Sequence, residues 1–335
     1  MTWRSRLLPG FIVGLVVWGL QVSTPRTQAP QPEYDPLQVS PGARPAPMDL
    51  TVTDAARQRT VPVLVYLPTN QTAAPVVLFS HGLGGSRHGA AYLGRHWAAR
   101  GYVVVFLQHP GSDEHVWRDV PLRQRLTALQ AAANAQQFLA RALDVRVVLD
   151  TLTQWNRTEG HPLQGRLHMT KVGMSGHSFG AVTTQAVSGQ TGLVGQRLTD
   201  ARIRAALPMS PSAPANGTAA DAFGQVAIPW LLMTGTLDTS PINRTTVADR
   251  RRVYTALPPG GKYELVLFEA RHSAFTDRDL PGDQGSRNPD HHRRIEALST
   301  AFWDAWLGDH AAARAWLDGT GPRRLLDARD GWQRK

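Results

Sequence analysis

Residues 171–184 read KVGMSGHSFGAVTT, with a serine at the centre of a G-x-S-x-G pattern. Gly176 and Gly180 stand two positions before and after Ser178, an apolar run precedes them, and helix-forming residues follow. A serine on a tight strand-to-helix turn exposes its hydroxyl, and side chains at the flanking positions would collide with neighbouring backbone. The stretch therefore predicts a nucleophile elbow with Ser178 as nucleophile. The N-terminus of the following helix would face developing negative charge.

Short apolar runs bounded by Gly, Pro or Asp lie on both sides of this elbow and predict strands. The runs are continuous, which is typical of strands covered on both faces. They span 75–80, 102–108, 171–175, 203–209, 228–234 and 263–269, and residues 48–68 predict an antiparallel pair turning near Ala55 and Ala56. Segments 88–100, 122–152, 244–257 and 295–307 carry apolar residues at helical spacing. This alternation predicts an α/β fold, a mostly parallel, doubly wound sheet with helices on both faces.

Two residues downstream of the elbow supply what its serine would need. A serine hydroxyl is a weak nucleophile that requires a histidine base, and the base requires an orienting carboxylate. Asp238 follows one predicted strand in LLMTGTLDTSP, and His272 follows the next in LVLFEARHSAF. Both fall at carboxyl ends of strands, on the sheet edge where ligands of open α/β sheets bind. The alternatives are a turn or capping aspartate and a structural histidine.

A glycine-rich loop, HGLGG at residues 81–85, follows the strand at 75–80. Such a loop can donate one oxyanion-hole N–H, while the residue after the nucleophile donates the second. We therefore predict the backbone amides of Leu83 and Phe179 as the two donors. Trp117 and Pro211 are candidate substrate-binding side chains, with ordinary core packing as the alternative.

Several motifs carry a resemblance over roughly residues 48–320. FSHGLGG, GHSFGA and RHSAFTD resemble the platelet-activating-factor acetylhydrolases, whereas the strand order and TGTLDTSP resemble dienelactone-hydrolase-like esterases and cutinase-type polyester hydrolases. The resemblance implies an α/β-hydrolase fold and hydrolysis of carboxylic esters (EC 3.1.1 type) by a Ser178–His272–Asp238 triad through an acyl-enzyme.

The chain departs from each of these branches at one point. The acetylhydrolases carry their aspartate after the strand following the nucleophile, where this chain has ALPMSPSAP without an acid. Asp238 lies one strand later and matches the second branch. Dienelactone hydrolases use a cysteine, which this chain lacks, and Leu83 stands where cutinase-type enzymes usually have an aromatic residue.

The amino-acid composition excludes several kinds of site and partner. The 335 residues contain no cysteine, which excludes disulfides, thiolate metal sites and a cysteine nucleophile. The net charge of +10 comes from dispersed arginines, with residues 250–252 the longest run, so we expect a solvated basic surface and no nucleic-acid partner. No cofactor and no metal are expected. Two clusters of possible ligands match no known ligand motif: His109 with Asp113 and His115, and Asp277 with Asp279 and Asp283. The sequence leaves open whether the loop at 277–283 binds an ion.

The N-terminal residues have the charge and hydropathy pattern of a targeting segment rather than of a folded domain. Arg4 and Arg6 precede an apolar stretch at residues 7–20, and prolines are frequent from residue 25 onward. We therefore expect a signal peptide or N-terminal membrane anchor at 1–22, a Pro-rich linker at 23–47 and one catalytic domain at 48–335. This organisation predicts an exported protein, periplasmic or extracellular, retained at the membrane if the segment is not cleaved. A buried helix of the domain is the alternative.

The expected partner is a small-molecule or lipid-like ester. Two further functions stay open at this point. One is a lipase- or phospholipase-like acyl hydrolase at a membrane surface, which the positive charge would favour. The other is a non-catalytic binding protein on a hydrolase scaffold, because fold does not fix function.

Overall fold

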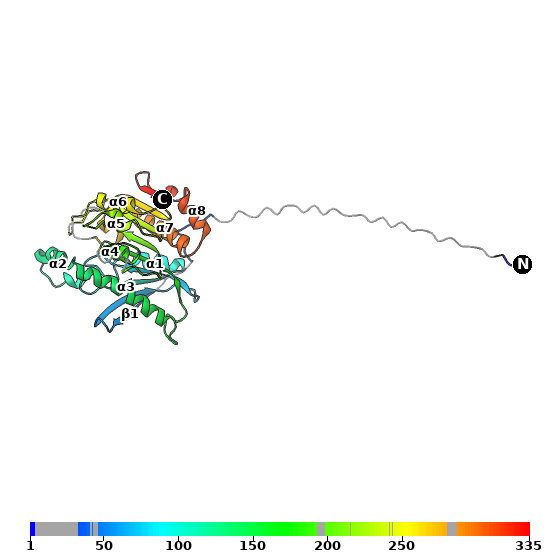
Figure 1. The fold of residues 1–335 in the computed structure, drawn as a ribbon, viewed down its shortest axis with the longest axis horizontal. Helices are drawn as coiled ribbons and strands as arrows, with labels where there is room; N and C mark the ends of the chain where they lie inside the picture. The colour runs from blue at the N-terminus through cyan, green and yellow to red at the C-terminus, as the bar shows by residue number, and fades with distance from the viewer. Residues whose placement is uncertain are drawn as a thin grey trace. The chain divides into compact units, whose positions relative to one another are not determined.

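The computed structural model describes residues 1–3, 33–40, 42, 46–192, 198–214, 216–240, 242, 244–279 and 287–335 (Figure 1). The described residues from 34 to 335 form one compact unit, which does not include residues 1–33. Most of the segment predicted as a signal peptide or anchor, residues 4–22, lies outside the described residues. Among the helices in the described ranges, none is both long enough and apolar enough to cross a membrane.

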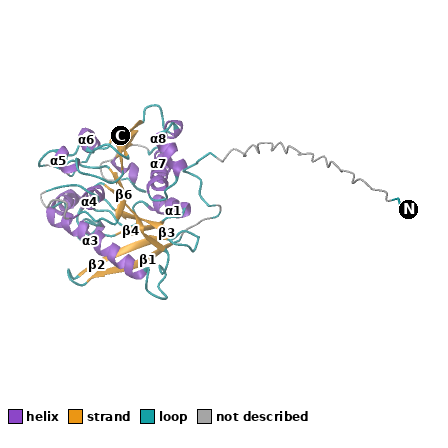
Figure 2. Ribbon diagram, turned by 45° about the vertical axis from the view of Figure 1, so that its right-hand side comes forward, coloured by secondary structure: helices purple, strands orange, loops and turns teal. Residues whose placement is uncertain are grey.

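A nine-stranded sheet, in the part of the chain described, organises the compact unit in the order β1-β2-β4-β3-β5-β6-β7-β8-β9 (Figure 2). Its strands are β1 (Pro47–Asp54), β2 (Arg59–Tyr66), β3 (Ala74–Ser80), β4 (Val103–Leu107), β5 (Leu167–His177), β6 (Ile203–Met209), β7 (Trp230–Leu237), β8 (Lys262–Arg271) and β9 (Gly331–Arg334). Strands β3 to β8 run parallel, whereas β1, β2 and β9 pair antiparallel at the two ends. The predicted α/β-hydrolase fold class is confirmed.

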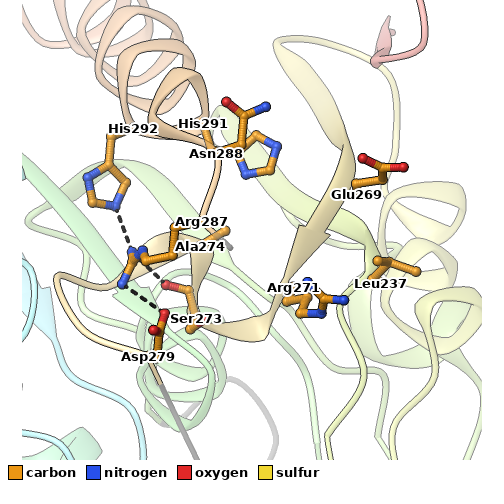
Figure 3. A pocket seen from close by; sticks show the side chains of 10 residues that line it. All are labelled: Leu237, Glu269, Arg271, Ser273, Ala274, Asp279, Arg287, Asn288, His291 and His292. Carbon is orange, nitrogen blue, oxygen red and sulfur yellow. Dashed lines mark hydrogen bonds and ion pairs between the residues drawn. The ribbon is translucent and has the colours of Figure 1, made fainter. Parts of the chain in front are cut away.

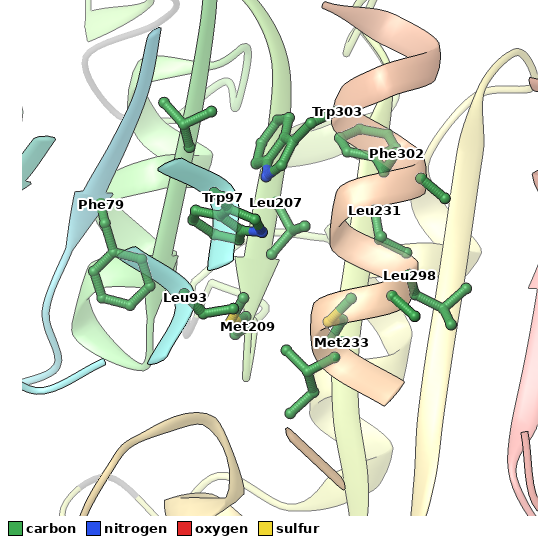
Figure 4. Close-up of a cluster of buried hydrophobic side chains, with 14 of the residues drawn as sticks. Phe79, Leu93, Trp97, Leu207, Met209, Leu231, Met233, Leu298, Phe302 and Trp303 are labelled. Carbon is green, nitrogen blue, oxygen red and sulfur yellow. The ribbon is translucent and has the colours of Figure 1, made fainter. Parts of the chain in front are cut away.

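Helices cover both faces of the sheet, as the continuous apolar strands predicted. One face packs on α1 (Ala91–Arg100), α7 (Pro289–Trp306) and α8 (Ala311–Asp318). Figure 4 shows part of this core, in which Trp97 of α1 meets Trp303 of α7 edge to face at 5.8 Å. The other face packs on α3 (Ala135–Trp155), α4 (Phe179–Val187), α5 (Ala219–Phe223) and α6 (Val247–Ala256). The short α9 (Gly321–Leu325) precedes β9.

Three features differ from the prediction. The single helix expected over 122–152 is split into α2 (Arg125–Ala132) and α3, because the Asn134 side chain caps α3 by accepting the Gln137 N–H at 2.9 Å. The C-terminal strand β9 was not predicted. The compact unit also begins within the expected linker, because the Tyr34 hydroxyl donates to Asp304 at 2.7 Å and its ring contacts Trp316.

Candidate active site

The elbow has the strained geometry that its sequence predicted. Strand β5 ends at His177, helix α4 begins at Phe179, and Ser178 between them has φ +58° and ψ −115°. A Cβ on Gly176 would lie 2.3 Å from the Gly180 oxygen, and one on Gly180 would lie 1.9 Å from the Ser80 oxygen. Both flanking positions therefore have no room for a side chain, and a non-glycine residue at positive φ is typical of functional sites.

The structure brings together Ser178, His272 and Asp238. The Ser178 Oγ lies 2.8 Å from Nε2 of His272, which begins a 3₁₀ turn directly after β8. The His272 Nδ1 lies 2.7 Å from Oδ1 of Asp238, which follows β7. Asp238 and His272 are buried, while Ser178 is partly exposed, so a substrate could reach the hydroxyl but not the carboxylate.

The second oxygen of Asp238 is also fully engaged. Its Oδ2 accepts hydrogen bonds from the hydroxyls of Ser210 at 2.7 Å and Thr234 at 2.8 Å. Burial by itself raises the pKa of Asp238, but His272, Arg250 and Ser210 together outweigh burial and hold the pKa well below its usual range. Asp238 is therefore anionic at neutral pH. Ser210 follows β6 directly, in the region where the acetylhydrolase resemblance would have placed an acid.

Arg250 is a buried member of this site that the sequence analysis missed. Its Nε lies 3.0 Å from Asp238 Oδ1, and its Nη1 donates to the carbonyls of Ser210 at 2.8 Å and Pro211 at 3.1 Å. The run 250–252 was expected to be solvated, and this expectation is wrong for Arg250, which is 2% exposed on the inward side of α6. Successive residues of a helix point in different directions, so Arg251 and Arg252 lie on other sides of α6, where they are exposed.

The predicted oxyanion donors lie on either side of the nucleophile. A Cβ on Gly82 would approach the Ser178 Cβ to 3.4 Å, so the 81–85 loop lies directly against the elbow. Phe179 is the first residue of α4, where backbone amides have no partner within the helix. Among the described residues, no backbone or side-chain acceptor is found for the amide of Leu83 or of Phe179.

Trp117 and Pro211 both lie close to this machinery. The Trp117 indole donates to the Gly84 oxygen at 2.7 Å, so Trp117 contacts the predicted oxyanion loop. Pro211 is buried, and its carbonyl binds Arg250. Neither contact tests their predicted role in binding substrate.

Members of the two clusters discounted as metal sites form hydrogen bonds, some within the cluster and some to other groups of the protein. His109 contacts Ser80 and Asp144, His115 contacts Asp113, and Asp277 accepts the first amide of α1 at 2.6 Å. Asp283 lies outside the described residues. In the described ranges, no group of three or more His, Cys, Asp or Glu side chains could hold a metal ion.

A polar cavity of about 410 Å³ lies beside the His272 turn, and Figure 3 shows it. Ser273 and Ala274, which follow His272, form part of its wall, but Ser178 does not. It is lined by Leu237, Glu269, Arg271, Ser273, Ala274, Asp279, Arg287, Asn288, His291 and His292. We therefore do not assign this cavity to the acyl group.

One family model matches the chain, that of platelet-activating factor acetylhydrolase, isoform II, over residues 61–116. The matched segment contains the 81–85 loop. It ends at Val116, directly before Trp117 and well before the elbow at Ser178. No curated protein matches the chain significantly. The resemblance to dienelactone-hydrolase-like and cutinase-type enzymes stays a prediction. The chain has an α/β-hydrolase fold, and over residues 61–116 it is similar to the platelet-activating factor acetylhydrolases.

Proposed function

We propose that the protein is a serine hydrolase that cleaves carboxylic esters through an acyl-enzyme intermediate. The observation that carries the proposal is the continuous relay from Ser178 Oγ through His272 to Asp238, with links of 2.8 and 2.7 Å. Its hydroxyl end is accessible at the strained elbow, and its carboxylate end is buried and anionic. This is the arrangement that activates a serine hydroxyl.

In this mechanism His272 Nε2 accepts the proton of Ser178 as Oγ attacks the ester carbonyl. Asp238 holds the imidazole in the required tautomer and stabilises the imidazolium that forms. The amides of Leu83 and Phe179 donate to the oxyanion of the tetrahedral intermediate, and each such donor contributes about 3 kcal/mol. His272 then protonates the leaving alcohol, and water attacks the acyl-enzyme with the same histidine as base.

A lipid-like ester is the second candidate substrate, and one observation favours it. Leu122 and Leu126 are exposed (80% and 47%) on the segment that contains α2. The same segment packs on the oxyanion loop, since a Cβ on Gly84 would lie 2.6 Å from Leu129. Exposed apolar side chains beside a hydrolytic site suit contact with aggregated lipid. Activity that rises sharply when the substrate passes its critical micelle concentration would favour this candidate over a soluble ester.

The test is initial-rate hydrolysis of p-nitrophenyl esters, from acetate to palmitate, by the full-length protein and by Ser178→Ala. We expect Ser178-dependent turnover, and the chain-length optimum would distinguish short esters from lipid-like ones. A fluorophosphonate probe should label the wild type at Ser178 and leave the variant unlabelled. Equal rates for the two proteins would show that Ser178 takes no part in the reaction. The absence of both labelling and turnover would favour a non-catalytic binding protein.

Export belongs to the same proposal and rests on the sequence of residues 1–22. We propose delivery to the periplasm or the cell exterior, either with cleavage or with retention by the N-terminal segment. Cell fractionation combined with N-terminal sequencing of the recovered protein tests both points. Recovery of the uncleaved chain from the cytoplasm alone would contradict export.

A further inference from the structure

A completely buried guanidinium lies beneath the predicted oxyanion loop. Arg141 of α3 donates from Nε to the Ser112 hydroxyl at 2.8 Å and from Nη1 to the His81 carbonyl at 2.7 Å. Among the ion pairs of the described residues, none includes Arg141. Asp144 and Asp113 act on its charge from a greater distance, and their carboxylates are hydrogen-bonded to His109 and Gln108. Burial lowers the pKa of Arg141 to about 9, so it is still charged at neutral pH. Burying a cation without a directly paired anion costs several kcal/mol, and such a cost calls for a compensating role.

The guanidinium acts on the peptide unit that carries one predicted oxyanion donor. The Gly82 carbonyl and the Leu83 N–H belong to the same planar trans peptide, so fixing the carbonyl fixes the direction of the amide. This carbonyl accepts from His81 Nδ1 at 2.7 Å, from the Gly85 amide at 3.0 Å and from Arg141 Nη2 at 3.4 Å. Donors at the oxygen also polarise the peptide, which strengthens its N–H as a donor.

The same guanidinium contacts the residue that carries the second predicted donor. Its central carbon lies 4.5 Å from the centre of the Phe179 ring, a cation–π contact. Arg141 therefore contacts the Gly82 carbonyl, on the peptide that carries the Leu83 N–H, and the ring of Phe179, on the two sides of the space where the oxyanion would form. It approaches from the protein interior, and the substrate would approach from the solvent side.

A second Ser–His–Asp relay supports this arrangement from below. Ser80 Oγ lies 2.9 Å from His109 Nε2, and His109 Nδ1 lies 3.0 Å from Asp144 Oδ2. All three side chains are fully buried, so no substrate can reach Ser80. Arg141 Nη1 donates to the same Ser80 hydroxyl at 3.4 Å. The relay therefore acts as a rigid support for the end of β3, where the oxyanion loop begins.

We propose that Arg141 is a positioning residue of the oxyanion hole. It orients the amides of Leu83 and Phe179, and its charge, which no directly paired carboxylate neutralises, favours negative charge on the bound intermediate. This inference rests on the proposed esterase function.

The test compares Arg141→Met with the wild type, because methionine keeps an unbranched side chain without charge or donors. We expect kcat for the best p-nitrophenyl ester to fall about 10- to 100-fold, less than for complete loss of a donor, with KM nearly unchanged. The inhibition constant of a trifluoromethyl ketone with the same acyl chain should rise by the same factor. The serine Oγ adds to the carbonyl of this ketone and forms a hemiketal oxyanion, whereas the carboxylate product forms no such adduct, so inhibition by the product should change little.

Arg100→Met is the matched control. Arg100 is also a mostly buried arginine, but it lies at the end of α1 beside the amino ends of the strands and pairs with Asp304 at 2.7 Å. We expect it to lower stability while leaving the ratio of ketone to product inhibition as in the wild type. If Arg141→Met does not fold, Ser112→Ala removes the acceptor of Arg141 Nε, and a several-fold loss of kcat with a matching loss of ketone affinity is expected.

The outcomes separate this inference from the proposed function. Normal, Ser178-dependent wild-type turnover with a folded Arg141→Met that retains its kcat would overturn the positioning role alone. Parallel losses of ketone and product binding would do the same, because they indicate a general structural defect. Absence of Ser178-dependent turnover in the wild type would overturn the proposed function, and the inference with it.

Discussion

Arg250 Nε and Asp238 Oδ1 lie 3.0 Å apart, and the same carboxylate oxygen lies 2.7 Å from Nδ1 of His272. Nη2 of Arg250 reaches within 3.3 Å of that imidazole nitrogen. A buried guanidinium thus shares the oxygen that would orient the proposed base. Because its Nη1 also binds the Ser210 carbonyl, the arginine connects the carboxyl ends of β6 and β7.

We predict that Arg250→Met lowers both stability and activity. The substitution leaves Asp238 without its cation and removes a donor from three backbone carbonyls, those of Asp238, Ser210 and Pro211, and breaking a buried ion pair costs about 3–5 kcal/mol. Urea denaturation should show this loss, and kcat should fall because the carboxylate is no longer held in place. Arg252→Met is the control, since Arg252 is 57% exposed and its pair with Asp249 contributes less than about 1 kcal/mol. Similar losses in the two variants would contradict the importance of the Arg250 contacts.

Asp238→Asn tests whether Asp238 orients the base or only caps a turn. Asparagine has nearly the same shape, but it favours the wrong imidazole tautomer, so we expect kcat to fall about 10⁴-fold. Asp249→Asn is the control, because Asp249 lies in the capping box of α6 and makes no contact with the proposed triad. Wild-type kcat in Asp238→Asn would reassign Asp238 as a turn residue, the alternative that the sequence left open.

Gly180→Ala tests the packing of the elbow. The added Cβ would lie 1.9 Å from the Ser80 backbone oxygen, so β3 and α4 must separate. Overpacking of this kind typically costs 1–3 kcal/mol, and the shift also displaces the Phe179 amide. We expect a lower urea midpoint and a loss of fluorophosphonate labelling. At Gly192, where nothing lies within 4 Å of the added Cβ, alanine should change neither quantity. Normal labelling of a stable Gly180→Ala would contradict the close packing.

The sequence was sufficient to predict the sheet and the positions that meet at its carboxyl edge. Ser178, Asp238 and His272 each come within four residues of the end of a predicted apolar run and directly after an observed strand. Parallel strands place their carboxyl ends on one edge whatever their separation in the chain. The short-range spacing of glycines around Ser178 similarly predicted where side chains could not fit. These sequence signals are local, and the parallel order of the strands brings the signalled residues together in space.

The buried charges could not be predicted in the same way. Arg250 differs from its two arginine neighbours only in the face of α6 on which it lies, and the sequence does not say which face packs inward. Arg141 and Asp144 gave a weak signal, since they stand among apolar residues of α3 at positions that prove to be buried. The contact of Tyr34 with Asp304 spans 270 positions and has no local pattern at all. Long-range burial of polar groups depends on tertiary packing, which periodicity does not encode.

A last prediction concerns Glu296 of α7, which is not part of the proposed triad. Burial raises the pKa of Glu296 to about 7, and Arg95 opposes the shift only partly. Between the ordinary carboxyl value of 4.5 and about 7, the folded state holds a proton that the unfolded state has lost, so stability falls as pH rises through this window. Glu296→Gln, which is permanently neutral, should therefore be more stable than the wild type at pH 8, by roughly 1–3 kcal/mol after allowing for partial exposure, and nearly equal to it at pH 4. Urea midpoints at the two pH values measure this difference, with the exposed Glu159→Gln as control for the substitution itself. An advantage of the same size at pH 4 and pH 8 would show that the gain does not come from the titration of Glu296.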